Sequence, residues 1–246
     1  MPFSRAGRLP DDGGNPPSAE TGTRGAIYSS FKSARHIDGK PRSVGWGGSR
    51  NTANRTSDGL TLAQVEGIRA AAQAAMRLGI PLNAHVTIHW ERLRVSDGAA
   101  AAATGAFLTR VRDWLRKQGL PFAYAYAREN GDGKGSHVHI LAHLPAGADW
   151  ASHRSKRWLS AIAGGFYQGG AIVTKRIGGT RYGRVTLPDL YARNLTRVVG
   201  YVTKGALPAV AAALALEQQA YGGLVIGKRA GWSENLGRLV HTAQAG

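Results

Sequence analysis

The stretch that decides the fold is Gly135-Ser136-His137-Val138-His139-Ile140-Leu141-Ala142-His143-Leu144-Pro145. Apolar residues alternate with histidines in it, and because successive side chains of a β-strand point to opposite faces, the pattern predicts a strand. His137 and His139 then lie side by side on one face, where two neutral imidazoles can bind one metal ion or phosphate. His143 lies further along the same strand, and we expect it to be structural or to support the site from outside.

A second strand is predicted just before the histidine strand. Aromatic residues alternate over residues 121–127, and the glycine-rich segment 131–135 can turn the chain back into a hairpin. Glu129 then comes to lie beside the two histidines. One carboxylate and two imidazoles form a compact site for a divalent metal, with positions left for a substrate. The alternative is that these histidines are hydrogen-bonded structural residues of an ordinary strand.

Composition narrows the class of protein. The chain has 246 residues, 43% of them hydrophobic, and a net charge of +17 that lies mainly after residue 151. Such a charge attracts polyanions, of which nucleic acid is the commonest and an acidic membrane surface the alternative. With no cysteine, a metal must be held by histidine, carboxylate or backbone ligands. No run of about 18 apolar residues and no apolar leader is present, so we expect a soluble, cytoplasmic protein.

The chain divides into a tail and a folded domain. Residues 1–58 are rich in Gly, Pro, Ser, Asn, Thr and Arg, which predicts a basic, mostly disordered tail that is either a solvated leader or a non-specific phosphate contact. Residues 59–246 form the domain, which ends in a basic C-terminal extension. Thr61 and Gln64 have the spacing of a capping box. Periodicity predicts helices over 62–78, 101–118, 149–162, 188–204 and 208–219, strands over 82–90 and 224–226, and a basic hairpin over 171–187.

The helix at 188–204 carries a tyrosine on a polar face. Its apolar side is formed by Leu195, Val198, Val199 and Val202, and its opposite side by Asn194, Arg197, Tyr201 and Lys204. The basic neighbours would favour the phenolate of Tyr201 over the phenol and would also bind a phosphate. Tyr191 is a competing candidate, but it is rotated by roughly 80° around the helix and has no lysine three residues later.

Taken in order, Glu129, His137-Val138-His139 and Tyr201-Val202-Thr203-Lys204 resemble the motifs of the HUH endonuclease superfamily. That superfamily contains rolling-circle replication initiators, conjugative relaxases and single-stranded-DNA transposases. The resemblance covers about residues 82 to 204. It implies an α+β fold, with a central antiparallel sheet, flanking helices and a ferredoxin-like nuclease core.

The resemblance also implies a reaction. Glu129, His137 and His139 would hold Mg²⁺ or Mn²⁺, Tyr201 would attack the scissile phosphate, and Lys204 would orient the phosphate or stabilise charge. The products would be a free 3′-hydroxyl and a 5′-phosphotyrosine, which suits nicking and rejoining of single-stranded DNA or a DNA hairpin at an origin. No helicase segment is recognisable, so unwinding would need a host helicase.

Seven basic residues and one asparagine elsewhere are expected to bind the DNA backbone, although a solvated polar surface is the simpler explanation for each. They are Arg154, Lys156, Arg157, Lys175, Arg176, Asn194, Arg197 and, within the expected hairpin, Arg181.

The segment 222–228 imitates a phosphate-binding loop, but Arg229 stands where Ser or Thr must hold magnesium. We therefore expect no nucleotide cofactor.

Three other functions remain open. The protein could be a transposase or relaxase of the same superfamily, a hydrolase in which metal-bound water attacks, or a basic nucleic-acid-binding module without catalysis. The JAMM-type hydrolase pattern also contains His-x-His, but Gly147 and Trp150 occupy the places of its downstream Ser and Asp. His85 and His89 lie on the polar face of the strand at 82–90, and we expect them to be surface groups or supports of the site.

Overall fold

The computed structural model describes residues 54–146, 148, 153–179, 183–217, 220–237 and 240. Most of the expected disordered tail, the first residues of the helix predicted over 149–162 and the predicted DNA contact Arg181 lie outside these residues. The folded part begins before residue 59, because β1 (Thr56–Ser57) pairs antiparallel with β6 (Val225–Ile226). The boundary predicted at residue 58 is therefore a few residues too late.

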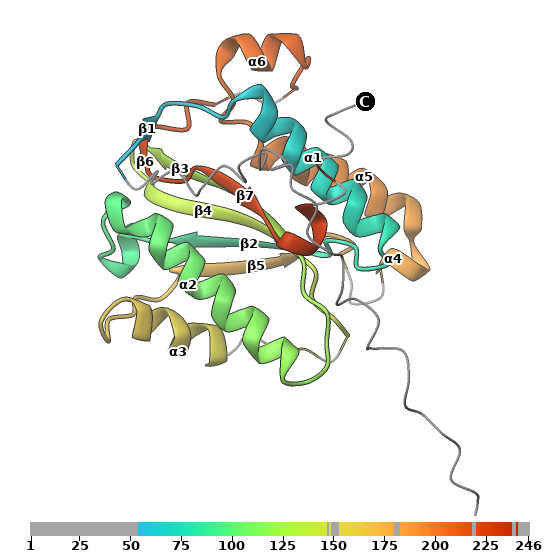
Figure 1. The fold of residues 1–246 in the computed structure, drawn as a ribbon, viewed down its shortest axis with the longest axis horizontal. Coiled ribbons are helices and arrows are strands. Elements are labelled where there is room, and N and C mark those ends of the chain that lie inside the picture. Colours follow the sequence, from blue (N-terminus) through green and yellow to red (C-terminus); the bar gives the residue numbers. More distant parts are fainter. Residues whose placement is uncertain are drawn as a thin grey trace, which may run out of the picture. The chain divides into compact units, whose positions relative to one another are not determined.

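A five-stranded antiparallel sheet forms the centre of the domain (Figure 1). Across the sheet, the strands stand in the order β5 (Ile172–Arg176), β2 (Ala84–His89), β4 (Gly135–Ala142), β3 (Tyr124–Gly131) and β7 (Ala230–Trp232). With helices on both faces, the domain has the α+β architecture that we expected. The hairpin of β3 and β4 is also confirmed.

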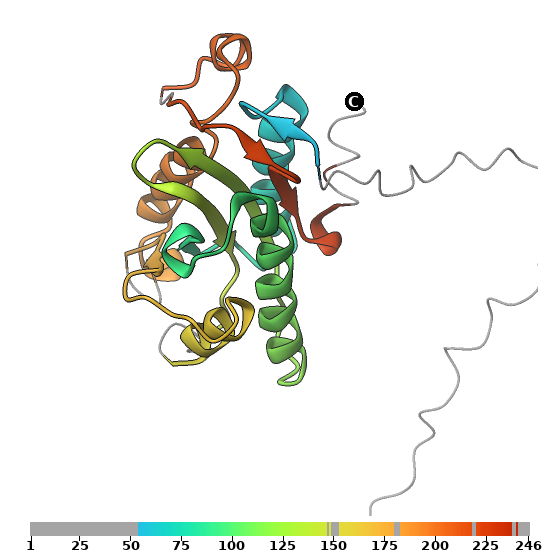
Figure 2. The ribbon, with the colours of Figure 1, turned by 90° about the vertical axis from the view of Figure 1, so that its left-hand side faces the viewer.

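Helices cover the two faces of the sheet in pairs (Figures 1 and 2). α1 (Leu62–Arg77) and α5 (Pro188–Val202) pack on one face, while α2 (Asp97–Arg116) and α3 (His153–Ile162) pack on the other. Each face has its own buried core. The alternation of the strands decides which residues enter which core, because Val138 and Ile140 face α2 and α3 while Leu141 faces α1 and α5.

The helix predictions hold with shifted ends. α1 has the expected capping box, in which Thr61 and Gln64 each bond the other's backbone N–H. α2 begins four residues before the predicted Ala101, because Ser96 has the extended backbone of a cap residue and its carbonyl accepts from Ala99 and Ala100. Shorter helical pieces are η1 (Glu91–Leu93), α4 (Gly183–Thr186) and α6 (Pro208–Ala213).

Three predictions after residue 170 are wrong. The expected basic hairpin does not form, because β5 pairs with β2 and residues 183–186 are helical. α6 ends at Ala213 instead of continuing to residue 219, and Ala215 just beyond it has a left-handed backbone with φ of 46°. The supposed basic extension contains β7, which pairs with β3 at the edge of the central sheet.

None of the described helices is both long and apolar enough to cross a bilayer.

Candidate metal centre

The β3–β4 hairpin sets the register that builds the site. Glu129 stands directly opposite His137, and Gly131 opposite Gly135. Gly135 suits the turn into β4 because its φ of +58° is left-handed, a backbone conformation that residues with a side chain rarely adopt.

Glu129, His137 and His139 form a buried triad on the face of the sheet that α1 and α5 cover. Their side chains offer one ligand atom each, and these atoms lie within 4.8 Å of one another. Oε2 of Glu129 is 3.2 Å from Nε2 of His137 and 3.7 Å from Nε2 of His139. The three residues are 6%, 3% and 2% exposed. This group could hold a metal ion.

The outer nitrogens of both rings have partners that leave the inner nitrogens facing Glu129. Nδ1 of His137 lies 2.8 Å from the carbonyl of Gly135, which can only accept, so Nδ1 carries the proton. Nε2 of the same ring faces Glu129, so it is the nitrogen that a cation between the two side chains could bind. Nε2 of His139 is buried and has no hydrogen-bond partner, as expected for a nitrogen suited to a metal.

Strand β2 supports the triad from the side. Its residues Thr87 and His89 stand opposite His139 and His137 of β4. Thr87 Oγ1 and His85 Nε2 lie 3.1 and 3.3 Å from Nδ1 of His139, and the ring of His89 lies 5.5 Å from that of His137.

Burial and the neighbouring histidines lower the pKa of His85 and of His89 to about 4, so both are neutral at neutral pH. Burial lowers the pKa of His139 as well, against the opposing effect of Glu129. Low pKa values suit a metal site, because a protonated imidazole cannot bind a cation.

His143 lies outside the triad, where its Nδ1 is 2.8 Å from the carbonyl of Pro81.

Lys204 reaches the same carboxylate from just beyond the end of α5. Its Nζ contacts both carboxylate oxygens of Glu129. Burial alone would raise the pKa of Glu129, but the two histidines and the charge of Lys204 outweigh it and hold that pKa well below its usual range. Lys204 thus already neutralises Glu129, and a metal ion bound there would compete with it.

Tyr201 lies beside the triad. Its ring centroid is 5.0 Å from that of His139 and 5.8 Å from that of His85, and Nζ of Lys204 lies 4.6 Å from the ring centroid. Burial and the charge of Glu129 raise the pKa of Tyr201. The expectation that basic neighbours favour the phenolate is therefore wrong for this arrangement, in which Lys204 is paired with Glu129.

Tyr191, the competing tyrosine, lies in the core. It is 2% exposed, and its hydroxyl donates to the carbonyl of Leu82 at 2.9 Å. Of the two tyrosines, the structure brings only Tyr201 to the triad.

The basic residues expected to bind DNA are not gathered in one place. Lys175 stands opposite His85 and so shares the sheet face of the triad, whereas Arg176 stands opposite the buried Ala84 and belongs to the other face. Asn194 and Arg197 lie on α5, the helix that carries Tyr201. Exposed residues of α3 lie on the far face of the sheet, away from the triad; they are Arg154, Lys156 and Arg157.

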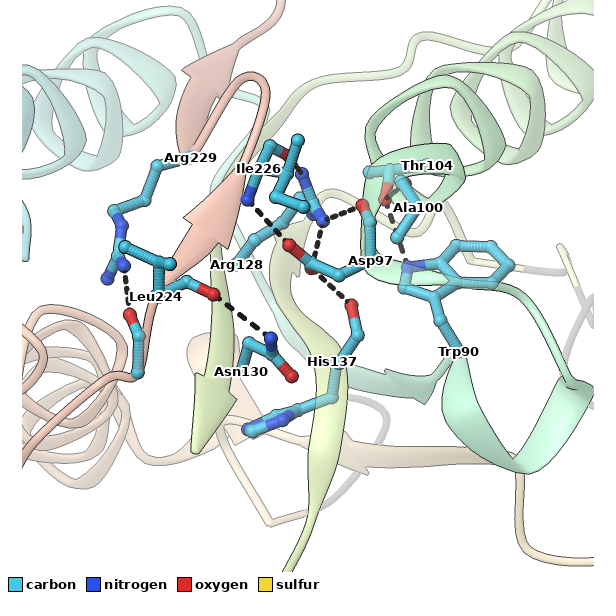
Figure 3. A network of polar contacts seen from close by, with 12 residues as sticks. Trp90, Asp97, Ala100, Thr104, Arg128, Asn130, His137, Leu224, Ile226 and Arg229 are labelled. Carbon is cyan, nitrogen blue, oxygen red and sulfur yellow. Dashed lines mark hydrogen bonds and ion pairs between the residues drawn. The ribbon is translucent and has the colours of Figure 1, made fainter. Parts of the chain in front are cut away.

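A second buried ionic network was missed from the sequence (Figure 3). Asp97 accepts hydrogen bonds from Arg128 Nη2 at 2.5 Å, from Ser136 Oγ at 2.7 Å and from the backbone of Ile226 at 2.5 Å. Arg128 also donates to the carbonyl of Ile226 at 2.8 Å. The signal was available, because strand alternation places Arg128 on the face opposite to its neighbour Glu129.

Arg229 is also buried, although the sequence placed it in a basic end. Its guanidinium donates to the hydroxyl and the carbonyl of Ser57 at 2.9 and 2.6 Å, and so ties β1 to the segment between β6 and β7. Its Nη1 lies so close to Gly222 that a Cβ there would be 2.9 Å from it. Nothing in the sequence pattern around residue 229 distinguishes this buried arginine from an exposed one.

No protein-family model matches the chain, and neither does any curated protein or solved structure.

Proposed function

We propose that the protein is a metal-dependent endonuclease that nicks and rejoins single-stranded DNA through a covalent tyrosine intermediate, as in rolling-circle replication initiation. One observation carries this proposal: the ring of Tyr201 lies 5.0 Å from that of His139, beside a buried triad of side chains that could hold a metal ion. A nucleophile and an electrophilic ion held side by side are the two parts that phosphoryl transfer requires.

The residues divide the reaction between them. Glu129, His137 and His139 would hold a divalent cation such as Mg²⁺ or Mn²⁺, which when bound supplies charge neutralisation at the scissile phosphate. Tyr201 gives its phenolic proton to solvent and its oxygen forms a bond to phosphorus, while the bond from phosphorus to the 3′ oxygen breaks. The 3′ oxygen takes up a proton from solvent and leaves as a hydroxyl, and the 5′-phosphate stays on the tyrosine.

Lys204 would have one role before a metal ion binds to Glu129 and another role afterwards. In the structure it is paired with Glu129, and a cation on Glu129 would repel its ammonium group. The freed side chain can then donate hydrogen bonds to the phosphate or to the leaving oxygen. Because the phosphotyrosine retains a phosphodiester bond, the reverse attack by a 3′-hydroxyl reseals DNA. This favours an initiator or a strand-transfer enzyme, such as a transposase or relaxase, over a degradative nuclease.

The test is a denaturation-resistant adduct between protein and DNA. The protein is incubated with Mn²⁺ and a library of single-stranded oligonucleotides, with and without hairpins, and the adduct is detected on a denaturing gel and mapped by mass spectrometry. We expect an adduct on Tyr201, its loss in Tyr201→Phe and its retention in Tyr191→Phe.

The other outcomes identify the rival functions. Cleavage without an adduct, which persists in Tyr201→Phe, would show that water is the nucleophile. DNA binding without cleavage or adduct across the whole library would leave a non-catalytic binding module. Either result would refute the tyrosine mechanism.

A further inference from the structure

A groove separate from the triad runs between α1 and α5 and is bounded beyond them by the segment that follows α6. It encloses about 780 Å³, which is within the range of pockets that hold organic ligands. Apolar side chains form its floor; among them are Ala72 and Met76 of α1 and Leu195 and Val199 of α5. Met76 is 43% exposed, so part of this apolar surface faces solvent.

Arginines line the same groove from both helices. They are Arg69 from α1 and Arg193 and Arg197 from α5. Among the described residues that line the groove, Glu217 is the only acidic one. No ion pair between Glu217 and these arginines is found in the described part of the chain. The groove therefore combines an apolar floor with an excess of positive charge.

We propose that this α1–α5 groove binds a segment of single-stranded DNA beside the reaction centre. A single strand alternates bases, whose flat faces pack on apolar surface, with phosphates, which arginine binds well. A duplex keeps its bases stacked inside and could not use the apolar floor. The proposal rests on the proposed function for its choice of DNA and adds Arg69 and Arg193 to the expected contact Arg197.

The path of α5 links the groove to the triad. Tyr201 follows Arg197 by four residues, a rise of about 6 Å along the helix, and Gly200 lines the groove itself. Because α5 carries arginines into the groove and Tyr201 to the triad, a strand held in the groove is presented to the tyrosine by the same rigid element. The competing occupant is an acidic amphipathic helix of another protein, which the tests below distinguish.

The first test removes the arginines. Affinity for a labelled 20-nucleotide strand is measured by fluorescence anisotropy over a range of salt concentrations, in the presence of Ca²⁺ to suppress cleavage. The triple variant Arg69→Ala, Arg193→Ala and Arg197→Ala should bind at least about tenfold more weakly, and the slope of log affinity against log salt should fall by about 2, since each phosphate contact contributes about 0.7.

The control removes the same charge from the other side of the molecule. The variant Arg110→Ala, Arg112→Ala and Arg116→Ala changes exposed residues of α2, across the sheet from the groove. It should weaken binding by no more than about threefold through the change in net charge alone. Equal losses in the two triple variants would overturn the groove as the binding site.

The second test uses the absence of cysteine from the chain. Gln73→Cys places a single thiol in the groove, and Gln118→Cys places one at the exposed end of α2. The oligonucleotide should slow the reaction of a maleimide with Cys at position 73 by about tenfold and leave position 118 unchanged. Protection of position 73 by a glutamate-rich amphipathic peptide, but not by the oligonucleotide, would overturn the proposal in favour of a protein partner.

Failure of this proposal is distinguishable from failure of the proposed function. Tyr201→Phe should lose the adduct and keep normal protection of Gln73→Cys. If the adduct forms but position 73 is never protected, the groove proposal is wrong and the nuclease stands. If position 73 is protected but no adduct forms across the library, the groove binds DNA and the tyrosine mechanism is wrong.

Discussion

Arg128 and Glu129 are neighbours on β3, yet they form ion pairs of different kinds on opposite faces of the sheet. Arg128 is fully buried and reaches Asp97, whose oxygens also accept from a serine hydroxyl and a backbone amide. Glu129 reaches Lys204 and two histidines. Arg128 is thus held by the Asp97 carboxylate and by backbone carbonyls, whereas Glu129 is surrounded by side chains that can exchange partners.

The difference separates a structural pair from a functional one. Removing one partner of the Asp97–Arg128 pair strands a buried charge, and the groups around it cannot move away. The side chain of Lys204 keeps 14% exposure and lies just past a helix end, so it can leave Glu129 for solvent or a phosphate. Burial and ionic contact alone therefore do not distinguish the two pairs; the exchangeable partners of Glu129 do.

The largest expected effect is on the structural pair. Asp97→Ala should lower the free energy of unfolding by about 3–5 kcal/mol, because it leaves the guanidinium of Arg128 buried without its counter-ion. Urea denaturation followed by circular dichroism measures this.

The matched control for Asp97→Ala lies on the same helix. Asp113→Ala removes an aspartate whose pairs with Arg112 and Arg116 are exposed, and it should cost no more than about 1 kcal/mol. If Asp97→Ala does not fold, Asp97→Asn replaces it. A cost for Asp97→Asn equal to that of Asp113→Ala would contradict the structural assignment.

The next effect is on metal binding. Glu129→Gln should reduce Mn²⁺ affinity about a hundredfold or more, since it removes the only charged ligand of the triad. The loss of Mn²⁺ affinity is measured by isothermal titration calorimetry and by the electron paramagnetic resonance spectrum of free Mn²⁺. The Asp97→Asn variant should bind Mn²⁺ normally under conditions in which it is folded, and an unchanged affinity in Glu129→Gln would remove the triad as the metal site.

A smaller effect of opposite sign is expected at Lys204. Lys204→Met should raise Mn²⁺ affinity in the absence of DNA by roughly tenfold, or about 1.4 kcal/mol, because the ammonium no longer competes for Glu129. The same variant should form less adduct with DNA. Lys175→Met provides the control, since Lys175 lies on the same sheet face opposite His85 and no ion pair joins it to Glu129 in the described part of the chain. Equal metal affinities of Lys204→Met and wild type would show that the lysine is not a competitor.

The smallest effect separates the two tyrosines. Tyr191→Phe loses one buried hydrogen bond, to the carbonyl of Leu82, and should lower the free energy of unfolding by about 1 kcal/mol. Tyr201→Phe should change it by less than about 0.5 kcal/mol, because no described hydrogen bond from the Tyr201 hydroxyl is lost. Thermal or urea unfolding of the two variants distinguishes them, and a larger cost for Tyr201→Phe would indicate that Tyr201 is structural.

The local parts of the fold and site could be read from the sequence. Alternation identified the histidine strand, and the glycines between residues 131 and 135 identified the turn that brings Glu129 opposite His137. These features depend on residues close together in the chain, where backbone geometry leaves few arrangements. The same reasoning identified α1 from its capping box and α5 from its apolar stripe.

Only the tertiary structure decided what happens between distant segments. That β7 joins the sheet, that Lys204 pairs with Glu129 across 75 positions of the chain, and that Arg229 is buried all depend on packing of remote elements. The sequence alone determined which side chains of β3 and β4 share a face, because a strand has a fixed period of two. Tertiary packing decided which of those faces meets Tyr201, since nothing local to a strand specifies the helix that will cover it.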